Sequence, residues 1–299
     1  MAEIRLQQIL VPLDGSLEAE CVLPYLRDLA PRFNAKVYIL GVGIGQKTRR
    51  VNRLLEDYIA KITEELSEQG IKAEGTVLYG KAAESILDFA QSKKANLILM
   101  ATHGLSGMTR WWLGSVAEKV VSAAATPIML VQAKRTEKHD ARSKKTIERI
   151  LVPLDGSELG QAALPYAEML TLKTGAALDL LHIVSPPGAI EASLLTGPDW
   201  IKLIQVLQKA GEDYLKEVIQ QLAERGIKAT YEVMTGEPAD KIVQYAEEKK
   251  ASLIAMSTHG RTGLARWVMG SVADKVVHGA SMPVWLVRSS KVLATGSKS

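Results

Sequence analysis

The feature that most constrains how this chain folds is a long internal repeat. The octapeptide I-L-V-P-L-D-G-S runs from Ile9 to Ser16 and recurs unchanged 141 positions later, from Ile150 to Ser157. A second pair of matching stretches, Ala101–Ser115 and Ser257–Ser271, lies 156 positions apart, so the second copy carries 15 additional residues. Each copy is long enough to bury a core of its own. We therefore predict two tandem domains, each with its own core.

The domain limits follow from where the repeated unit stops. The stretch Q-A-K-R-T-E-K-H-D-A-R-S-K-K-T between the copies is almost free of apolar residues and dense in charge, which is typical of a solvated linker. We predict a first domain over residues 1–133, a linker over 134–146 and a second domain over 147–290. The 15 additional residues are expected in a long loop at 185–200, where Pro and Gly are frequent.

Composition excludes several classes of protein. The formal net charge of the 299 residues is only +4, and basic residues alternate with acidic ones, so the sequence does not predict nucleic-acid binding. Cys21 is the only cysteine, which excludes an internal disulfide, and it lies among apolar residues that favour a packed over a reactive thiol. No apolar run reaches the ~18 residues that a membrane span needs. A cytoplasmic protein is expected.

Within each copy, apolar runs alternate with helical patterns. In the first copy the strands are predicted at 9–13, 37–42, 76–79, 97–101 and 128–131, and the helices at 16–30, 49–69, 82–93 and 115–124. Ser16 is the expected N-cap of the first helix, and Pro24 should kink that helix or separate its first turns. This alternation predicts an α/β fold with two doubly wound, five-stranded parallel sheets.

In doubly wound sheets, ligands bind beyond the carboxyl ends of the strands. Asp14 and Asp155 follow the first strands, where a carboxylate can accept hydrogen bonds from ribose hydroxyls or face a metal held by phosphates. The alternative is that each Asp only bonds the backbone of its own Asp-Gly turn. Proximity to a phosphate-binding loop favours the first interpretation.

The loop after the fourth strand has the features of a phosphate site. It contains glycines and opens a helix, whose N-terminal N–H groups and dipole attract anions. Ser115 and Ser271 begin these helices, so their hydroxyls can either cap the helix or reach a phosphate, and capping is the safer reading. The spacing matches neither G-x-x-x-x-G-K-[ST] nor G-x-G-x-x-G, which excludes a P-loop and a dinucleotide fingerprint.

Histidine precedes the first loop glycine in both copies, at His103 and His259. A histidine at a strand end suits an acid or a base, but no cysteine, carboxylate or second histidine is spaced to form a triad or a metal site. A hydrogen-bonding role within the loop is the favoured interpretation.

Taken together, the V-P-L-D-G-S strand end, the T-H-G loop and the G-S-V-A-[ED]-K-V-V helix start resemble the universal stress protein family in its tandem form. The ATP-binding members of that family carry G-x-x-G-x(9)-G-[ST]. Gly104 with Gly114-Ser115, and Gly260 with Gly270-Ser271, match the later part of this motif. Ala101 and Ser257 replace its first glycine, and both replacements are small.

The resemblance implies an adenine-nucleotide alpha hydrolase-like, Rossmann-like fold and a nucleotide site in each copy. By that resemblance, Asp14 and Asp155 meet the ribose, main-chain groups of Val42 and Ile183 meet the adenine edge, and backbone N–H groups hold the phosphates. It also implies that the fifth strands, 128–131 and 284–287, pair to form an internal pseudo-dimer. The implied site residues are Pro12, Asp14, Val42, Ala101, His103, Gly104, Gly114, Ser115 and Val116 in the first copy, and Pro153, Asp155, Ile183, Ser257, His259, Gly260, Gly270, Ser271 and Val272 in the second.

The expected function is an ATP-binding regulatory protein of the stress response, with any Mg²⁺ or Mn²⁺ held mainly by the phosphates. Fast catalysis is not expected, because the motifs contain a phosphate-binding loop but no residue positioned to act as a general base. At most, slow ATP hydrolysis or autophosphorylation would occur. The alternative is a scaffold of the same fold that binds no nucleotide and acts through a protein partner. A further homodimer of the tandem chain is compatible with either function.

Overall fold

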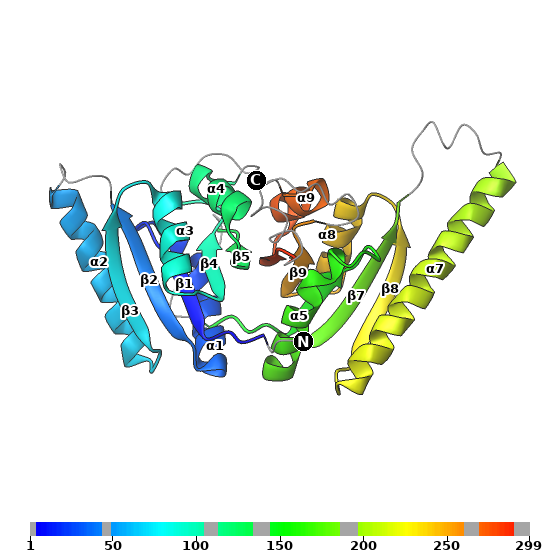
Figure 1. Cartoon of the computed structure of the whole chain (residues 1–299), viewed down its shortest axis with the longest axis horizontal. Helices are drawn as coiled ribbons and strands as arrows, with labels where there is room; N and C mark the ends of the chain where they lie inside the picture. The colour runs from blue at the N-terminus through cyan, green and yellow to red at the C-terminus, as the bar shows by residue number, and fades with distance from the viewer. Residues whose placement is uncertain are drawn as a thin grey trace.

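The computed structural model contains one continuous sheet of ten strands (Figure 1). The structure describes residues 4–43, 49–104, 113–133, 144–185, 197–259 and 269–289. The strand order is β3-β2-β1-β4-β5-β10-β9-β6-β7-β8, so each half contributes five adjacent strands. Neighbouring strands are parallel within each half, and only β5 and β10 pair antiparallel. The predicted α/β class with two doubly wound halves is confirmed.

The two halves contain matching elements. In the first half these are β1 (Gln8–Pro12), η1 (Ala19–Val22), α1 (Leu23–Phe33), β2 (Lys36–Gly43), α2 (Arg49–Glu68), β3 (Ala73–Tyr79), α3 (Ala82–Ser92), β4 (Leu97–Ala101), α4 (Ser115–Ala123) and β5 (Ile128–Val131). In the second half they are β6 (Arg149–Pro153), η2 (Gly160–Ala163), α5 (Leu164–Thr174), β7 (Ala177–Val184), α7 (Gly197–Glu224), β8 (Ala229–Thr235), α8 (Pro238–Glu248), β9 (Leu253–Ser257), α9 (Ser271–Gly279) and β10 (Val284–Val287).

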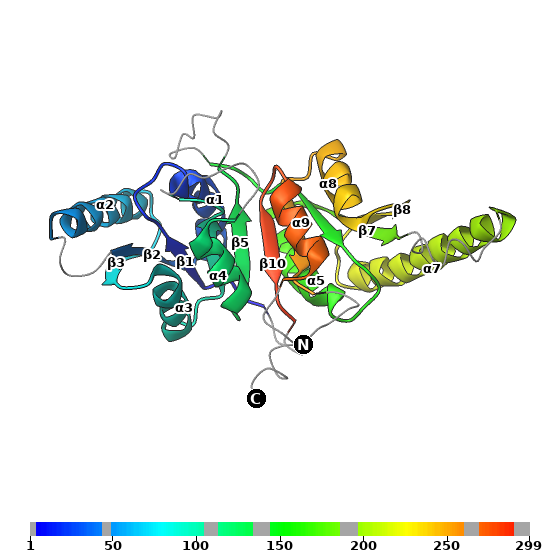
Figure 2. The ribbon, with the colours of Figure 1, turned by 90° about the horizontal axis from the view of Figure 1, so that it is seen from above.

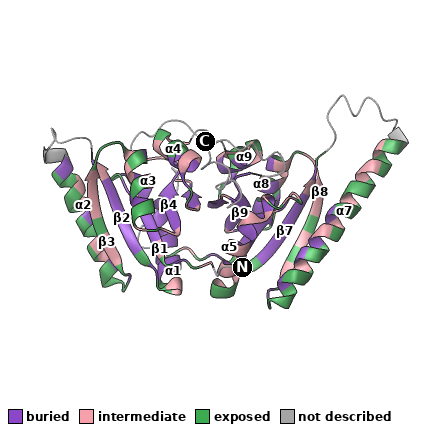
Figure 3. Cartoon of the chain, viewed as in Figure 1, coloured by how far each residue is buried: buried purple, intermediate pink, exposed green. Residues whose placement is uncertain are grey.

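The central strands are buried on both faces, as their unbroken apolar sequences require. Every residue of β4, β5, β9 and β10 is buried, whereas β3 and β8 at the two edges are only partly covered (Figure 3). No helix among the residues that the structure describes is long and apolar enough to cross a bilayer.

The two cores are divided by the sheet and not by the repeat. One cluster lies under α1, α2, α5 and α7, and the other under α3, α4, α8 and α9, so each cluster spans both halves. The prediction of one separate core for each copy is therefore wrong. Because β5 and β10 continue the sheet, apolar side chains of both halves pack on the same two faces.

The junction between the halves is the antiparallel pair β5–β10, which Figure 2 shows side by side at the centre of the molecule. Trp285 on β10 lies opposite Met129 on β5, and both are fully buried. The Trp285 ring packs on Tyr166 of α5, with 6.0 Å between centroids. Arg288 Nη2 donates a hydrogen bond of 2.7 Å across the junction to Ser122 O. The pairing of the fifth strands, implied by the family resemblance, is present.

The first helical segment differs from the single helix predicted over 16–30. A 3-10 helix, η1, precedes α1, and Pro24 occupies the first turn of α1, where its missing N–H costs no intrahelical hydrogen bond. Ser16 Oγ accepts a hydrogen bond of 3.1 Å from Ala19 N–H, so it satisfies a donor at the start of η1 and does not cap α1.

Residues 186–196, where part of the 15 additional residues of the second copy falls, lie outside the described residues. The helix α7 has 28 residues and its counterpart α2 has 20, so part of the insertion extends the helix. The loop predicted over 185–200 is therefore wrong at its end, where α7 begins at Gly197. Pro198 and Asp199 occupy the first turn of α7, where proline and acidic residues are favoured.

Candidate functional site

A cavity of about 300 Å³ opens at the carboxyl edge of the first half, where β1, β2 and β4 end. Its walls come from the turn after β1, the end of β2, the loop after β4 and the first turn of α4. The structure brings together all nine residues predicted for the first copy: Pro12, Asp14, Val42, Ala101, His103, Gly104, Gly114, Ser115 and Val116.

Asp14 contacts both its own turn and the opposite loop. Its Oδ1 accepts hydrogen bonds from Ser16 N–H at 3.0 Å and from Ser16 Oγ at 2.5 Å, which is the turn role considered in the sequence. Its Oδ2 lies against Gly104, where a Cβ atom would come within 2.0 Å of it. A side chain at position 104 would force the Asp14 carboxylate out of this place. Asp14 therefore serves the turn and also lines the cavity.

The first turn of α4 lines the cavity. Gly114 is the N-cap and makes no side-chain capping bond, so the predicted capping role of Ser115 is wrong. The N–H of Gly114 donates to Thr102 O at 2.8 Å and is therefore not available to a phosphate. Helix geometry leaves the next three N–H groups, those of Ser115, Val116 and Ala117, without an intrahelical acceptor. All three residues line the cavity.

His103 has the structural role that its sequence context favours. Its Nδ1 lies 3.1 Å from Thr102 Oγ1, and its Nε2 is buried without a hydrogen-bond partner among the described residues. No group of three or more histidine, cysteine or acidic side chains that could hold a metal occurs in the described part of the chain. The cavity thus offers one carboxylate, Asp14, and no ready-made metal centre.

A second cavity of about 320 Å³ lies in the equivalent place in the second half. Eight of the nine predicted residues line it: Pro153, Asp155, Ile183, Ser257, His259, Gly270, Ser271 and Val272. The ninth, Gly260, lies outside the described residues.

The backbone of the second cavity repeats that of the first. Asp155 Oδ1 accepts from Ser157 N–H at 2.9 Å and from Ser157 Oγ at 2.7 Å. Gly270 N–H donates to Thr258 O at 2.9 Å, so this N–H is also engaged. Gly270 is the N-cap of α9 without a side-chain cap, and the predicted capping role of Ser271 is wrong as well.

The two cavities differ at the position of the missing motif glycine. Ala101 is a small buried residue at the end of β4. Ser257, its counterpart on β9, is also buried, and its Oγ accepts a hydrogen bond of 3.3 Å from His259 N–H. Either residue fits its place, and the serine adds a polar contact within its own loop.

Sequence reasoning missed the side wall of each cavity. Ala82 and Ile86 of α3 line the first, and Pro238 and Ile242 of α8 line the second. Each pair is spaced i, i+4 at the start of the helix that follows the third strand, so the two side chains share one helix face. That spacing is visible in the sequence, but it is equally typical of a core-facing helix. Gly80 and Gly236, just before these helices, do not line the cavities.

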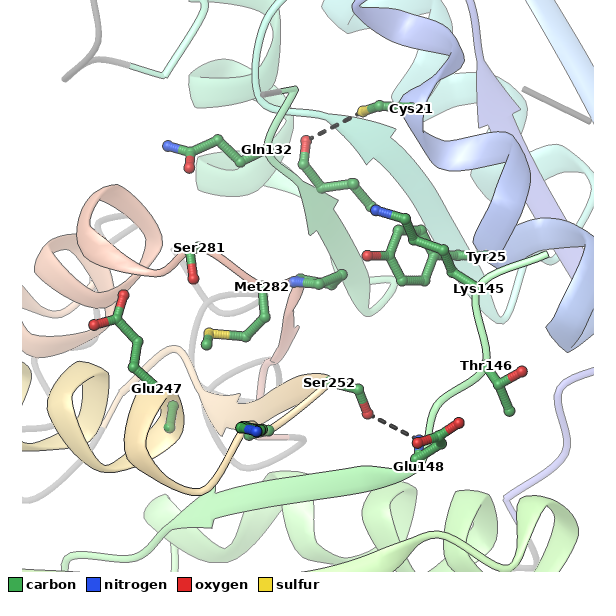
Figure 4. Close-up of a pocket in the computed structure, with 15 residues that line it drawn as sticks. Cys21, Tyr25, Gln132, Lys145, Thr146, Glu148, Glu247, Ser252, Ser281 and Met282 are labelled. Atoms are coloured by element: carbon green, nitrogen blue, oxygen red, sulfur yellow. Dashed lines mark hydrogen bonds between the residues drawn. The ribbon is translucent and has the colours of Figure 1, made fainter. Parts of the chain in front are cut away.

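Another cavity, of about 510 Å³, lies at the junction of the two halves (Figure 4). Cys21 and Tyr25 lie on its first-half side, and Glu247 and Met282 on its second-half side. Cys21 Sγ lies 3.7 Å from Val131 O, and burial raises the pKa of this thiol to about 12. The thiol is therefore packed and protonated at neutral pH, as its sequence context favours.

In both halves, three chemical features meet at the carboxyl edge of the sheet. Free N–H groups at a helix N-terminus attract an anion. A carboxylate on the opposite turn accepts hydrogen bonds from hydroxyl groups. Apolar side chains of β2, β4 and α3, or their second-half counterparts, form a wall on which a flat ring can pack. An anionic ligand with hydroxyl groups and a flat apolar part fits this arrangement.

Comparison with known proteins gives a consistent family. The model of the "Universal stress protein family" matches residues 5–132 and 146–288. The universal stress protein MJ0531 of Methanocaldococcus jannaschii is 34% identical over 144 residues, which are 48% of this chain and 84% of that protein. A universal stress protein of Mycolicibacterium smegmatis is 26% identical over 221 residues, which are 73% of this chain and 70% of that one.

A solved structure shares the whole architecture. The crystal structure of a universal stress protein from Archaeoglobus fulgidus superposes with a TM-score of 0.69 at 23% identity, and the match covers 94% of this chain and 98% of that chain. At this identity the likeness establishes the fold.

Proposed function

The chain belongs to the universal stress protein family, and we propose that it is a regulatory protein that binds ATP in both halves. One observation carries the proposal: the residues that begin α4, whose N–H groups have no intrahelical acceptor, line the same cavity as Asp14, and the same arrangement recurs at α9 and Asp155. A phosphate chain suits the first group and a ribose the second. We propose two domains over residues 1–133 and 147–290, joined by 134–146.

The phosphates lie at the first turn of α4, where Ser115, Val116 and Ala117, whose N–H groups have no intrahelical acceptor, line the cavity. The N–H of Gly114 is excluded from this set, because it already donates to Thr102 O. In the second half, Ser271, Val272 and Ala273 have the equivalent places.

The ribose lies beside Asp14, whose carboxylate is held by Ser16 and so needs no rearrangement to accept from the two hydroxyl groups. The adenine packs between Pro12 and Val42 on the sheet side and Ile86 on the helix side. Main-chain groups at the end of β2 meet the adenine edge. Ile183, at the end of β7, has this place in the second half.

A divalent cation fits only as a companion of the phosphates, since each cavity offers a single carboxylate among its described lining residues. Mg²⁺ or Mn²⁺ would neutralise phosphate charge when bound. Asp14 would remain engaged with Ser16 and the ribose. Neither a lysine, an arginine nor a second carboxylate is among the described lining residues of either cavity, so slow turnover at most is expected.

ATP binding therefore serves regulation. Bound ATP couples the turn after β1, the loop after β4 and the start of α4. The protein's partners then distinguish the ATP-bound form from the free form. A cytoplasmic location is part of this proposal, because ATP is available there and the single thiol needs no oxidising compartment.

The test is binding of ATP to the purified full-length chain. We expect ATP at millimolar concentration to raise the melting temperature, because a ligand that binds only the folded state stabilises it. Titration calorimetry should show that both halves are filled. If ATP leaves the melting temperature unchanged and no heat of binding is measured, the chain is a scaffold of this fold that acts through a protein partner.

A further inference from the structure

One buried contact between a strand and a helix is built differently in the two halves, because the large and the small residue have changed places. In the first half, Gly41 on β2 lies beneath Ile59 and Leu55 of α2, and a Cβ atom on Gly41 would come 3.0 Å from Ile59 Cγ1 and 3.2 Å from Leu55 Cγ. In the second half, His182 of β7 stands at the position of Gly41, and Gly211 of α7 at that of Leu55. The side chain that fills the space therefore comes from the helix in one half and from the strand in the other.

A side chamber next to α7 adjoins this contact. The chamber has a volume of about 260 Å³ and is lined by Gly156, His182, Ile183, Val184, Ser185, Leu207, Ala210, Gly211 and Tyr214. At Gly211 a Cβ atom would come 2.6 Å from His182 Cδ2, so a leucine at this position could not be combined with the His182 ring. Gly211 and His182, the two residues that differ from the first half, both line the chamber.

The chamber adjoins the proposed nucleotide cavity of the second half. Ile183 and Ser185 line both spaces, and Gly156 follows Asp155 directly in the chain. The chamber therefore borders the base and ribose end of the cavity, while the phosphate end at Ser271 lies on α9. Its volume is below the roughly 300–1,000 Å³ of self-standing ligand sites, so it suits part of a ligand.

The lining selects an uncharged, flat group. No lysine, arginine, aspartate or glutamate is among the described lining residues. His182 Nδ1 donates to Leu154 O at 2.8 Å, which fixes the ring. The His182 ring and the Tyr214 ring meet edge to face, with centroids 6.1 Å apart. Two rigid rings with aliphatic neighbours favour a third aromatic ring, and they offer no countercharge to an ionised group.

We propose that the nucleotide cavity of the second half takes a nucleotide that carries an additional uncharged aromatic group at its ribose or base edge, and that this group lies in the side chamber. The first half, where Leu55 packs on Gly41, takes only the plain nucleotide. The inference rests on the proposed function, because the chamber is useful to a nucleotide only if the adjoining cavity binds one.

The experiment compares three ligands on the full chain by titration calorimetry. ATP is the reference, methylanthraniloyl-ATP carries an aromatic group on the ribose, and N6-benzyl-ATP carries one on the base edge. We expect ATP to fill both halves and at least one of the two analogues to bind in the second half alone, about tenfold tighter there than ATP. The analogue that binds identifies the edge of the nucleotide that faces the chamber.

The matched variant copies the first half into the second. His182→Gly combined with Gly211→Leu should weaken analogue binding by about tenfold or more and leave ATP binding within about twofold. Leu207→Trp, which fills the chamber from its rim, should have the same effect without altering the packed pair. Leu54→Trp on the exposed face of α2 is the control, and it should change neither ligand.

Each result decides one of two claims. If ATP fails to bind, the proposed function and this inference both fall. If ATP binds but both analogues bind both halves equally, or bind neither, or are unaffected by the folded variants, only this inference is overturned.

Discussion

His182 and Gly211 are an interlocked pair: a Cβ atom on Gly211 would lie 2.6 Å from His182 Cδ2. The residues come from β7 and α7 and stand where the first half has Gly41 and Leu55. In the second half the large residue is on the strand and the small residue is on the helix, the reverse of the first half. The residue at one position therefore limits what fits at the other. The pair also sets how closely α7 approaches the sheet.

A double-mutant cycle tests this dependence. Gly211→Leu should lower the free energy of unfolding by about 1–3 kcal/mol because it overpacks the contact. His182→Gly should lower it by about 2–4 kcal/mol because it leaves a cavity and a flexible residue in a strand. The double variant should be more stable than the sum predicts by about 1 kcal/mol or more, measured by urea denaturation. Additive effects would show that the two residues do not share the space.

Ser115→Pro separates the N–H group from the hydroxyl in phosphate binding. Proline is favoured at the first helical position, and Gly114 before it has the extended conformation (φ −58°, ψ 147°) that a following proline requires. The helix should therefore persist while one donor to the phosphate is lost, and ATP affinity in the first half should fall by about tenfold. Ser115→Ala keeps the N–H and is the control.

The readout is calorimetry of the full chain with the second half unchanged. If Ser115→Ala weakens ATP as much as Ser115→Pro does, the hydroxyl and not the backbone holds the phosphate. Equal affinity in all three proteins would remove α4 from the binding site.

Asp14→Asn tests the ribose contact. The amide oxygen can still accept from Ser16, so the turn should hold, but the negative charge that strengthens hydrogen bonds from the ribose hydroxyls is lost. ATP affinity in the first half should fall by about tenfold, whereas 2′,3′-dideoxy-ATP should bind the variant and the parent equally. A matching loss with the dideoxy ligand would show that Asp14 acts only through the fold. Asp155→Asn provides the same comparison in the second half.

Cys21 should be unreactive in the folded protein and should make stability fall at high pH. Burial, partly opposed by the charge of Lys145, raises the pKa of its thiol to about 12, whereas an unfolded cysteine ionises near ~8.5. The folded state therefore keeps a proton that the unfolded state releases. This contribution to stability is fully present below pH ~8.5 and is lost as the pH rises towards 12, by up to about 1.4 kcal/mol per pH unit.

Two measurements check this. A thiol reagent such as dithionitrobenzoate should label Cys21 in urea but not in native buffer at pH 8. Urea denaturation at pH 7.5 and pH 10 should show a smaller loss of stability for Cys21→Ala than for the parent. Rapid labelling of the native protein would contradict the buried position.

Local patterns were sufficient where one physical signal dominates. The predicted strands at 97–101 and 128–131 coincide with β4 and β5, because a short unbroken apolar run fits only a strand buried on both faces. The first helix was less predictable. Its start depends on how Pro24 is accommodated, and the chain solves this with a 3-10 turn before α1.

The candidate site was likewise predictable only in part. Glycine spacing and strand-end positions were enough to select residues that line the two cavities. Which N–H groups remain available was not visible, because the bond from Gly114 to Thr102 O joins the two ends of the loop between β4 and α4, and only the fold brings those ends together. The role of Ile86 could not be predicted either, because apolar residues have the same helical spacing whether that face of the helix lines a cavity or packs on the core.

By itself, the sequence determined the duplication, the alternation of strands and helices, and the family, because repeats and apolar periodicity are local properties of the chain. Only the tertiary structure decided that the two cores run across both halves, that Gly114 is engaged with Thr102, and that Gly211 makes room for His182. Each of these depends on contacts between residues far apart in the chain. Their positions follow from how the sheet, once continuous through β5 and β10, packs against the helices on its two faces.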